Sequence, residues 1–98
     1  MQDASVAGVC EQACGALWNM TCNANNQVSA GTAGGVEEVV KVLRNHVGVA
    51  GVCEQACGAL CNMTYYNNAY YQVLAGTAGG VEEVVKVLRN HARLGGVC

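Results

Sequence analysis

The chain has little charge and contains no proline or phenylalanine. Charged residues make up 12% of its 98 residues, about half the usual share, and only five are Lys or Arg. So few positive charges, within a net charge of −2, exclude the basic surface by which nucleic-acid-binding proteins usually contact phosphates. They also argue against a polybasic membrane patch, and no stretch approaches the roughly 20 apolar residues that a membrane span needs. We therefore expect neither a nucleic-acid partner nor a membrane partner.

Catalytic motifs are missing as well. The chain has no H-E-x-x-H, no G-x-S-x-G and no glycine-rich phosphate loop after a strand. The one titratable set that recurs is two glutamates followed by a histidine, and it would span roughly 12–14 Å on one helix. This is too far for a nucleophile to contact its base, whereas a histidine at a helix C-terminus suits the helix dipole. The sequence thus predicts no enzyme, no catalytic residue and no cofactor.

Cysteine is abundant, with seven residues. An odd count without a recognisable signal peptide argues against a secreted disulfide framework. Cys10 and Cys14, and again Cys53, Cys57 and Cys61, are spaced by four residues, which is helical spacing and not the C-x-x-C spacing of zinc sites. We expect reduced thiols that serve as small apolar side chains, no metal site, and a cytoplasmic protein, with the nucleus as the alternative compartment. A cysteine-based metal or redox module is the weaker alternative.

The main feature of the sequence is an internal repeat. Residues 6–21 and 49–64 are identical at 15 of 16 positions, and residues 27–46 and 72–91 are identical at 19 of 20. The offsets of 43 and 45 residues fall in the range of roughly 40–47 that is typical of HEAT and armadillo repeats. A third copy starts at residues 96–98, so we expect the sequence to be a fragment of a longer array.

Apolar residues within each copy recur at helical spacing. Val36, Val39, Val40 and Leu43 form one stripe with a period near 3.6 residues. A second stripe and its copy consist of Val9, Ala13, Ala16, Leu17 and Met20, and of Val52, Ala56, Ala59, Leu60 and Met63. The Val-rich run favours a strand by propensity, but its acidic start and basic end suit a helix dipole. The sequence predicts an all-α chain, with an i,i+4 ion pair between Glu37 and Lys41.

Four segments of the repeat follow one another in a fixed order. They are Asn25-Asn26-Gln27, Ala33-Gly34-Gly35-Val36-Glu37, Val42-Leu43 and Glu54-Gln55-Ala56-Cys57-Gly58-Ala59-Leu60-Cys61-Asn62-Met63. Their order and spacing resemble the armadillo repeat, in which a short first helix ends in an Ala-Gly-Gly corner and a third helix ends in a Leu-x-Asn-Leu-like motif. The resemblance implies an armadillo-like α-α superhelix, a short solenoid, in one domain spanning residues 1–98. Residues 6–22 would form the third helix of a preceding repeat, 23–65 a full repeat and 66–98 a partial one.

This register predicts the position of each helix and of its ends. The expected helices cover residues 6–22, 25–32, 36–46, 49–64, 68–77 and 81–91. Gly34-Gly35 and Gly79-Gly80 would form the corners, because glycine allows a positive φ or a close backbone approach at little cost. Asn25 or Asn26, and Asn67 or Asn68, would cap the first helices of the two units.

The resemblance also implies a binding surface. Armadillo third helices line the concave face of the superhelix, where asparagine side chains bond the backbone of an extended peptide. Carried over position by position, this face comprises Gln12, Gly15, Trp18, Asn19, Gln55, Gly58, Cys61 and Asn62. Alternatively, Asn19 and Asn62 bond the neighbouring repeat or cap their own helices, and Trp18 is a packed edge residue instead of an exposed anchor. Gly15 and Gly58 stand where nuclear-import adaptors of the family carry Trp, so that mode of binding basic peptides is not expected.

The sequence therefore predicts a non-catalytic protein-protein interaction module that binds a protein or an extended peptide. A structural spacer within a longer array is the main alternative. Solenoid repeats bury their apolar faces only by stacking, and roughly two units without polar caps would leave both ends exposed. We accordingly expect either end-to-end self-association or a loosely folded chain. Tyrosines 65, 66, 70 and 71 either form an interface or cover the next pair of helices.

Overall fold

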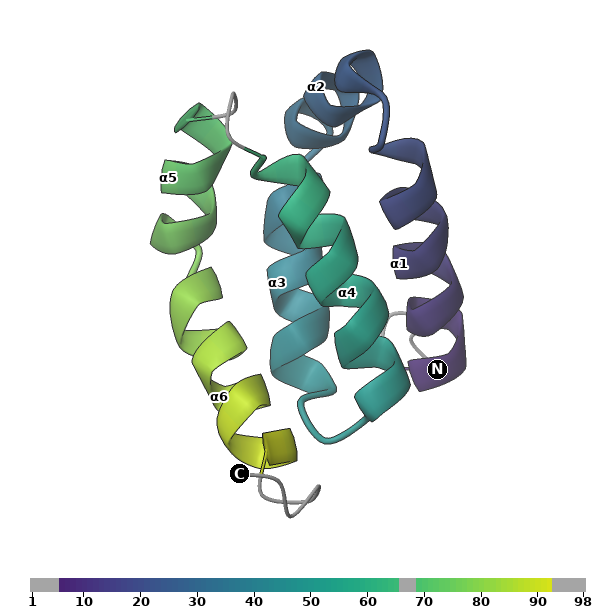
Figure 1. Cartoon of the computed structure of the whole chain (residues 1–98), viewed down its shortest axis with the longest axis vertical. Coiled ribbons are helices and arrows are strands. Elements are labelled where there is room, and N and C mark those ends of the chain that lie inside the picture. Colours follow the sequence, from purple (N-terminus) through teal and green to yellow (C-terminus); the bar gives the residue numbers. More distant parts are fainter. Residues whose placement is uncertain (1–5, 66–68, 93–98) are drawn as a thin grey trace.

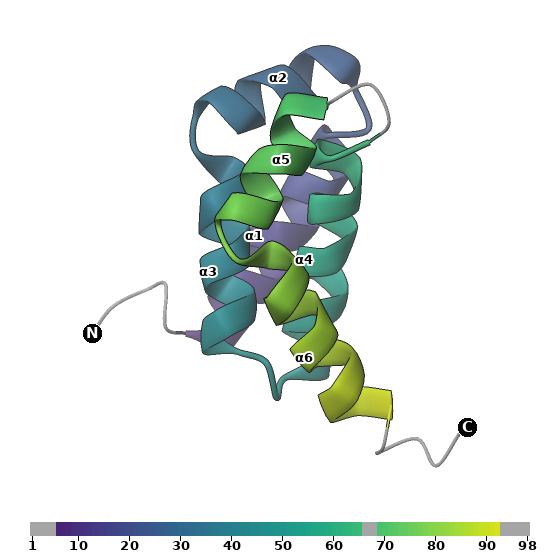
Figure 2. The same cartoon turned by 90° about the vertical axis from the view of Figure 1, so that its left-hand side faces the viewer.

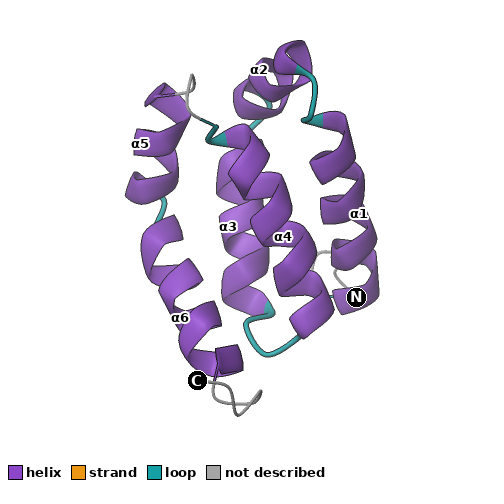
Figure 3. Ribbon diagram, viewed as in Figure 1, coloured by secondary structure: helices purple, strands orange, loops and turns teal. Residues whose placement is uncertain are grey.

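The computed structural model describes residues 6–65 and 69–92, and all regular structure in these two ranges is helical (Figure 3). The all-α class is therefore confirmed. The helices are α1 (Ala7–Met20), α2 (Ala24–Thr32), α3 (Gly35–Asn45), α4 (Ala50–Met63), α5 (Ala69–Thr77) and α6 (Gly80–Ala92). Each begins and ends within two residues of the position predicted from the sequence. None of these helices combines the length and the apolar character that a bilayer crossing requires.

The helices stack side by side in chain order. Figure 1 shows α1 at one side, α3 and α4 in the middle, and α5 and α6 at the other side. The parallel helices α1 and α4 share the most extensive contact, and α3 packs on α4, α5 and α6. After a quarter turn, α5 and α6 stand in front of α3 and α4, with α1 behind (Figure 2). The two copies of the repeat thus occupy successive positions along one stack.

The core lies between α3 and α4 and is built from the predicted apolar stripes. Val36, Val40 and Leu43 of α3 and Val52 and Met63 of α4 are completely buried. A regular apolar stripe can bury its whole width only where another helix covers it. The valine-rich run is helical in α3, where α4 covers its stripe, and also in α6, where Val81 and Leu88 are exposed, so cover by α4 alone does not account for the helix.

Both glycine corners have the predicted conformation. Gly34 has a φ of 86° and Gly79 a φ of 90°, the left-handed region that glycine enters at little cost. The second glycine of each pair starts the next helix. A Cβ on Gly35 would lie 2.8 Å from the Ala30 carbonyl oxygen, and one on Gly80 only 2.7 Å from that of Ala75. Each corner therefore requires two glycines, the first because its φ is positive and the second because a Cβ would collide with a backbone carbonyl oxygen.

The predicted caps of the first helices need correction. Asn25 and Asn26 lie inside α2, because the helix already begins at Ala24. The residue before it, Asn23, is the N-cap, and its side-chain oxygen accepts a hydrogen bond of 3.1 Å from the Asn26 N–H. The equivalent prediction for Asn67 and Asn68, and the third copy at residues 96–98, lie outside the described residues.

The predicted ion pair on α3 also forms differently. Lys41 contacts Glu38 at 3.3 Å, an i,i+3 pair, instead of Glu37. Glu37 turns one carboxylate oxygen into a buried position, where it has no hydrogen bond among the described residues. Both spacings place side chains on one helix surface, so the sequence alone does not decide between the two glutamates.

Candidate functional site

The predicted binding residues lie along the seam where α1 and α4 run side by side. Four of them, Gln12, Gly15, Asn19 and Gln55, line one hollow of about 370 Å³ with a mainly polar wall. Glu11 and Ala16 complete the wall, and Glu11 is its only ionisable side chain. Glu11 was not among the residues predicted from the sequence, although it stands four residues before Gly15 and eight before Asn19, on the same helix face.

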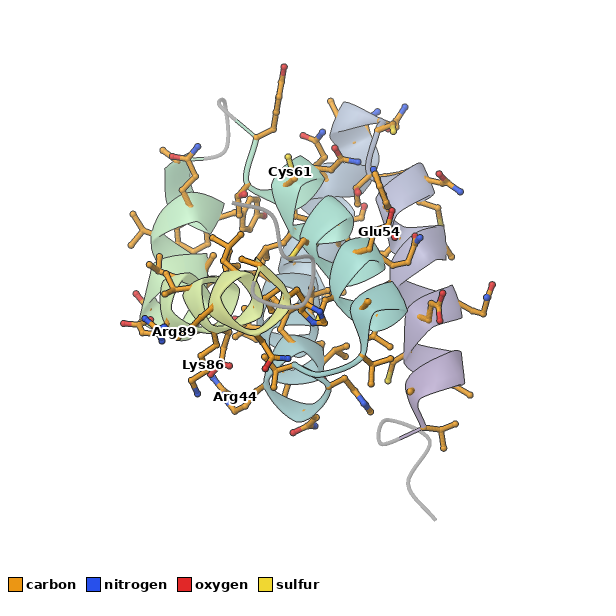
Figure 4. The ribbon with its side chains drawn as sticks, turned by 60° about the horizontal axis from the view of Figure 1, so that its bottom comes forward. Arg44, Glu54, Cys61, Lys86 and Arg89 are labelled. Atoms are coloured by element: carbon orange, nitrogen blue, oxygen red, sulfur yellow. The ribbon has the colours of Figure 1, made fainter. Side chains whose placement is uncertain are left out.

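Trp18 packs on the neighbouring helix. It is half-buried, and a Cβ on Gly58 would fall inside the van der Waals envelope of its indole ring. The absent side chain at Gly58 therefore provides the space that the ring occupies. At the matching position of the second copy, α4 carries the exposed Cys61 (Figure 4), so this large contact occurs once in the described residues.

The two asparagines of the predicted site have different surroundings. Asn62 donates a hydrogen bond of 2.8 Å from Nδ2 to the Trp18 carbonyl oxygen, which ties the end of α4 to α1. Asn19 is exposed, and its side chain makes no hydrogen bond to any residue of the described ranges. One asparagine therefore connects neighbouring repeats, as the sequence analysis allowed, and the other remains open to a ligand.

One of the tyrosines covers the neighbouring helix. Tyr71 is half-buried, its ring occupies the space above Gly31, and its hydroxyl lies 3.5 Å from the Val28 carbonyl oxygen. Tyr65 and Tyr70 are exposed, and Tyr66 lies outside the described residues. Tyr71 thus closes the contact between α2 and α5, in agreement with the covering role that the sequence analysis offered as one alternative.

Three of the thiols, those of Cys14, Cys53 and Cys57, lie in an environment that raises their pKa and favours the protonated form. Six of the seven cysteines are in the described ranges, and none of these six forms a disulfide. Burial raises the pKa of the Cys14 thiol, and nearby Cys10 raises it further. Burial likewise raises the pKa of Cys53, with a further contribution from Cys57, whose own pKa burial also raises. Because the thiolate is the form that binds metals and attacks disulfides, these three positions are poorly suited to either chemistry.

The raised pKa values make the stability of the fold sensitive to alkaline pH. A thiol whose pKa is higher in the folded protein stabilises the fold fully below the unfolded value, ordinarily 9.0, and loses that contribution as the pH rises through the folded value. We expect the free energy of unfolding to fall as the pH rises above the ordinary thiol value of 9.0. Urea titrations at several pH values should show that the free energy of unfolding falls less steeply with pH in the Cys14→Ala, Cys57→Ala double variant than in the unaltered chain. The exposed-site variant Cys22→Ala is the control; a slope reduced equally in both would contradict this origin.

Comparison with known proteins gave no match: no protein-family model, no curated protein and no solved structure matches this chain. Its function is therefore inferred from its own residues and their geometry. Within the described residues, no group of three or more His, Cys, Asp or Glu side chains is placed to hold a metal ion. The hollow on the α1–α4 seam is where four of the eight predicted site residues come together.

Proposed function

We propose that this chain is an armadillo-like solenoid segment, a non-catalytic cytoplasmic module that binds an extended peptide or a protein segment along the α1–α4 face. The observation that carries the proposal is the set of amide side chains around the hollow, namely Gln12, Asn19 and Gln55. Gln12 and Asn19 are exposed and Gln55 is half-buried, and none of the three side chains forms a hydrogen bond within the described ranges. They are therefore ready to bond a ligand.

The chemistry of these amides suits a peptide backbone. A carboxamide donates from its nitrogen and accepts at its oxygen, so it matches the alternating N–H and C=O groups of an extended chain. A row of such groups along α1 and α4 would form hydrogen bonds with the peptide backbone. The shape and charge of the hollow would then decide which peptide side chains are preferred. Glu11 is the one charged side chain there, so a neutral or basic ligand side chain is favoured over an acidic one.

The arrangement of the helices supports the armadillo assignment. A short helix, a glycine corner and two longer helices follow in order in α2, α3 and α4. The third-type helices α1 and α4 stand next to each other, as successive third helices do in an armadillo array. The hydrogen bond from the Gln27 side chain to the Thr21 carbonyl recurs between Gln72 and Thr64, at 2.9 Å in both copies. Successive units are therefore joined by the same contacts.

A structural spacer is the second candidate, and a specific observation favours it. Three of the eight predicted site residues, Trp18, Gly58 and Asn62, are engaged in the contact between α1 and α4. If the other five made similar contacts in a longer stack, this face would hold the array together and bind no ligand.

Peptide selection distinguishes the two candidates. We expect a displayed library of random dodecapeptides to yield binders whose affinity falls roughly 10-fold for Asn19→Ala and for Gln55→Ala, and up to about 100-fold for the double variant. Each substitution removes one hydrogen-bonding amide from the hollow without cutting into the core. Fluorescence anisotropy with one labelled binder at low protein concentration measures the effect.

The matched control is Asn25→Ala, which removes an exposed amide from α2. It should leave the peptide affinity unchanged. A selection that enriches no binder, or binders equally tight for the double variant, would support the spacer and reject the peptide-binding face.

A further inference from the structure

The end of the stack at α6 exposes a surface that the same sequence buries one repeat earlier. Val81 and Leu88 of α6 are 64% and 63% exposed, whereas Val36 and Leu43, their counterparts in α3, are completely buried. The helices differ in burial because α4 covers the stripe of α3, and no described helix takes that place against α6.

The opposite end of the stack exposes the complementary surface. Val9 and Met20 of α1 are 50% and 53% exposed, while their counterparts Val52 and Met63 in α4 are completely buried. In α4, Met63 belongs to the same buried cluster as the α3 stripe. One end of the molecule therefore exposes the apolar stripe of α6, which includes Val81 and Leu88 and is called the socket. The other end exposes α1, whose sequence is nearly that of α4, the helix that covers the same stripe in the interior.

A hollow marks the socket. It has a volume of about 330 Å³, an almost entirely apolar wall, and includes Gly80, Val81, Val84 and Val85 among its lining residues. The corresponding interior position is filled by α4, where the Met63 sulfur lies 3.3 Å from the place of a Cβ on Gly35. Met20 is the residue of α1 that corresponds to Met63, and Gly80 corresponds to Gly35.

Polar groups at the two ends also lack the partners that their interior counterparts have. Arg44 of α3 reaches across to α6, with Nε 3.2 Å from the Glu83 carboxylate and Nη2 donating to the Ala78 carbonyl. Figure 4 shows Arg44 beside Lys86, which also contacts Glu83, at 3.6 Å. Arg89, the counterpart of Arg44, has no ion pair within the described ranges.

The polar groups that correspond to Glu83 and Asn62 lie at the other end of the stack, on α3 and α1. Glu38, the counterpart of Glu83, contacts only Lys41 and has no second cation among the described residues. Asn19, the counterpart of Asn62, has an exposed and unbonded side chain. A second copy stacked in register would bring its Glu38 to Arg89, repeating the interior ion pair between Arg44 and Glu83.

We propose that two copies of this chain bind head to tail, with α1 of the second copy docked against α4, α5 and α6 of the first as α4 docks against α1, α2 and α3. A second copy is the occupant because its α1 segment shares 15 of 16 residues with the α4 segment that fills the interior socket. The interface is heterologous and leaves one socket and one α1 unpaired in every dimer. Assembly therefore continues into open chains and does not stop at two.

The junction is weaker than the interior seam. In the seam, the Trp18 ring packs over Gly58, whereas at the junction the smaller Cys61 would stand over Gly15 of the second copy. The junction buries less apolar surface at this point, so association depends on concentration while folding of the single chain does not.

Two charge substitutions test the proposal. Val81→Glu places a charge in the socket, and Val9→Glu places a charge on the surface of α1 that would dock there. Both sites are at least half exposed in the single chain, so the fold should be retained. Sedimentation of the unaltered chain should give a mean mass that rises with concentration past twice its 10.1 kDa. Each variant alone should remain at 10.1 kDa. An equimolar mixture should form a dimer and nothing larger, because only one intact socket meets one intact α1.

Val73→Glu is the matched control. Val73 is 69% exposed and its interior counterpart Val28 is still 53% exposed, so stacking does not cover this position and association should be unchanged. Circular dichroism verifies equal helix content in all variants. The proposal is overturned if the unaltered chain stays monomeric up to about 1 mM, a concentration at which even weak contacts are populated. It is equally overturned if Val73→Glu dissociates the chain or the mixture stays monomeric.

Discussion

Leu43→Ala is expected to destabilise the monomer by about 2–5 kcal/mol, whereas Leu88→Ala is expected to change its stability by less than about 0.5 kcal/mol. The two leucines occupy the same position in helices of nearly identical sequence. Leu43 is completely buried under α4, so truncation removes apolar contacts and leaves a cavity. Leu88 is 63% exposed, and its removal from the single chain leaves no cavity.

Urea denaturation followed by circular dichroism measures both effects, at a protein concentration low enough to keep the chain monomeric. A single domain of this size has about 5–10 kcal/mol of stability, so Leu43→Ala consumes a large part of it or unfolds the chain. At high concentration, Leu88→Ala should instead weaken self-association, since Leu88 lies in the socket. Equal losses for the two variants in the monomer would mean that α6 is covered within the single chain, and would reject the exposed socket.

The contrast between these leucines also shows what the sequence could predict. Helix positions follow from a period of 3.6 residues and corners from paired glycines, and both signals are local, so the helices were predicted within two residues of their ends. Burial is not local. The stripes of α3 and α6 are the same in sequence, and only the order of stacking decides that one is covered and the other is not.

The candidate site was predictable in outline and not in detail, for a similar reason. The spacing of Gln12, Gly15 and Asn19 placed them on one helix face, and they do line one hollow with Gln55. The hydrogen bond of Asn62 depends on how closely α4 approaches α1, which no pattern within one helix reveals. The cap at Asn23 was missed because three asparagines compete within four residues, and the structure alone shows which one precedes the first helical turn.

The single difference between the α1 segment, residues 6–21, and the α4 segment, residues 49–64, has a structural consequence. Residues 6–21 carry Trp18 where residues 49–64 carry Cys61. The tryptophan needs a neighbour without a side chain, and Gly58 provides one at the centre of α4, although glycine inside a helix costs about 1 kcal/mol relative to alanine. The glycine is therefore required where the tryptophan packs, and dispensable where it does not.

Gly58→Ala and Gly15→Ala, the same change in nearly identical helices, are expected to have opposite effects. At Gly15 the new Cβ meets only the tip of the flexible Gln55 side chain, 2.9 Å away, and the variant should gain up to about 1 kcal/mol from helix propensity. At Gly58 the Cβ collides with the Trp18 ring, and displacing the ring should cost about 1–3 kcal/mol, more than the propensity gain. Urea denaturation measures both changes.

A double-mutant cycle assigns the cost to the ring. In a Trp18→Cys background, which copies the residue of the second repeat, Gly58→Ala should become neutral or stabilising, because nothing remains for the Cβ to displace. The chain has one tryptophan, so its fluorescence reports directly on the ring, and the emission of Gly58→Ala should shift to longer wavelength as the indole moves into water. If Gly58→Ala instead stabilises the protein as much as Gly15→Ala and leaves the emission unchanged, the ring does not lie over Gly58, and the seam between α1 and α4 is not the one described.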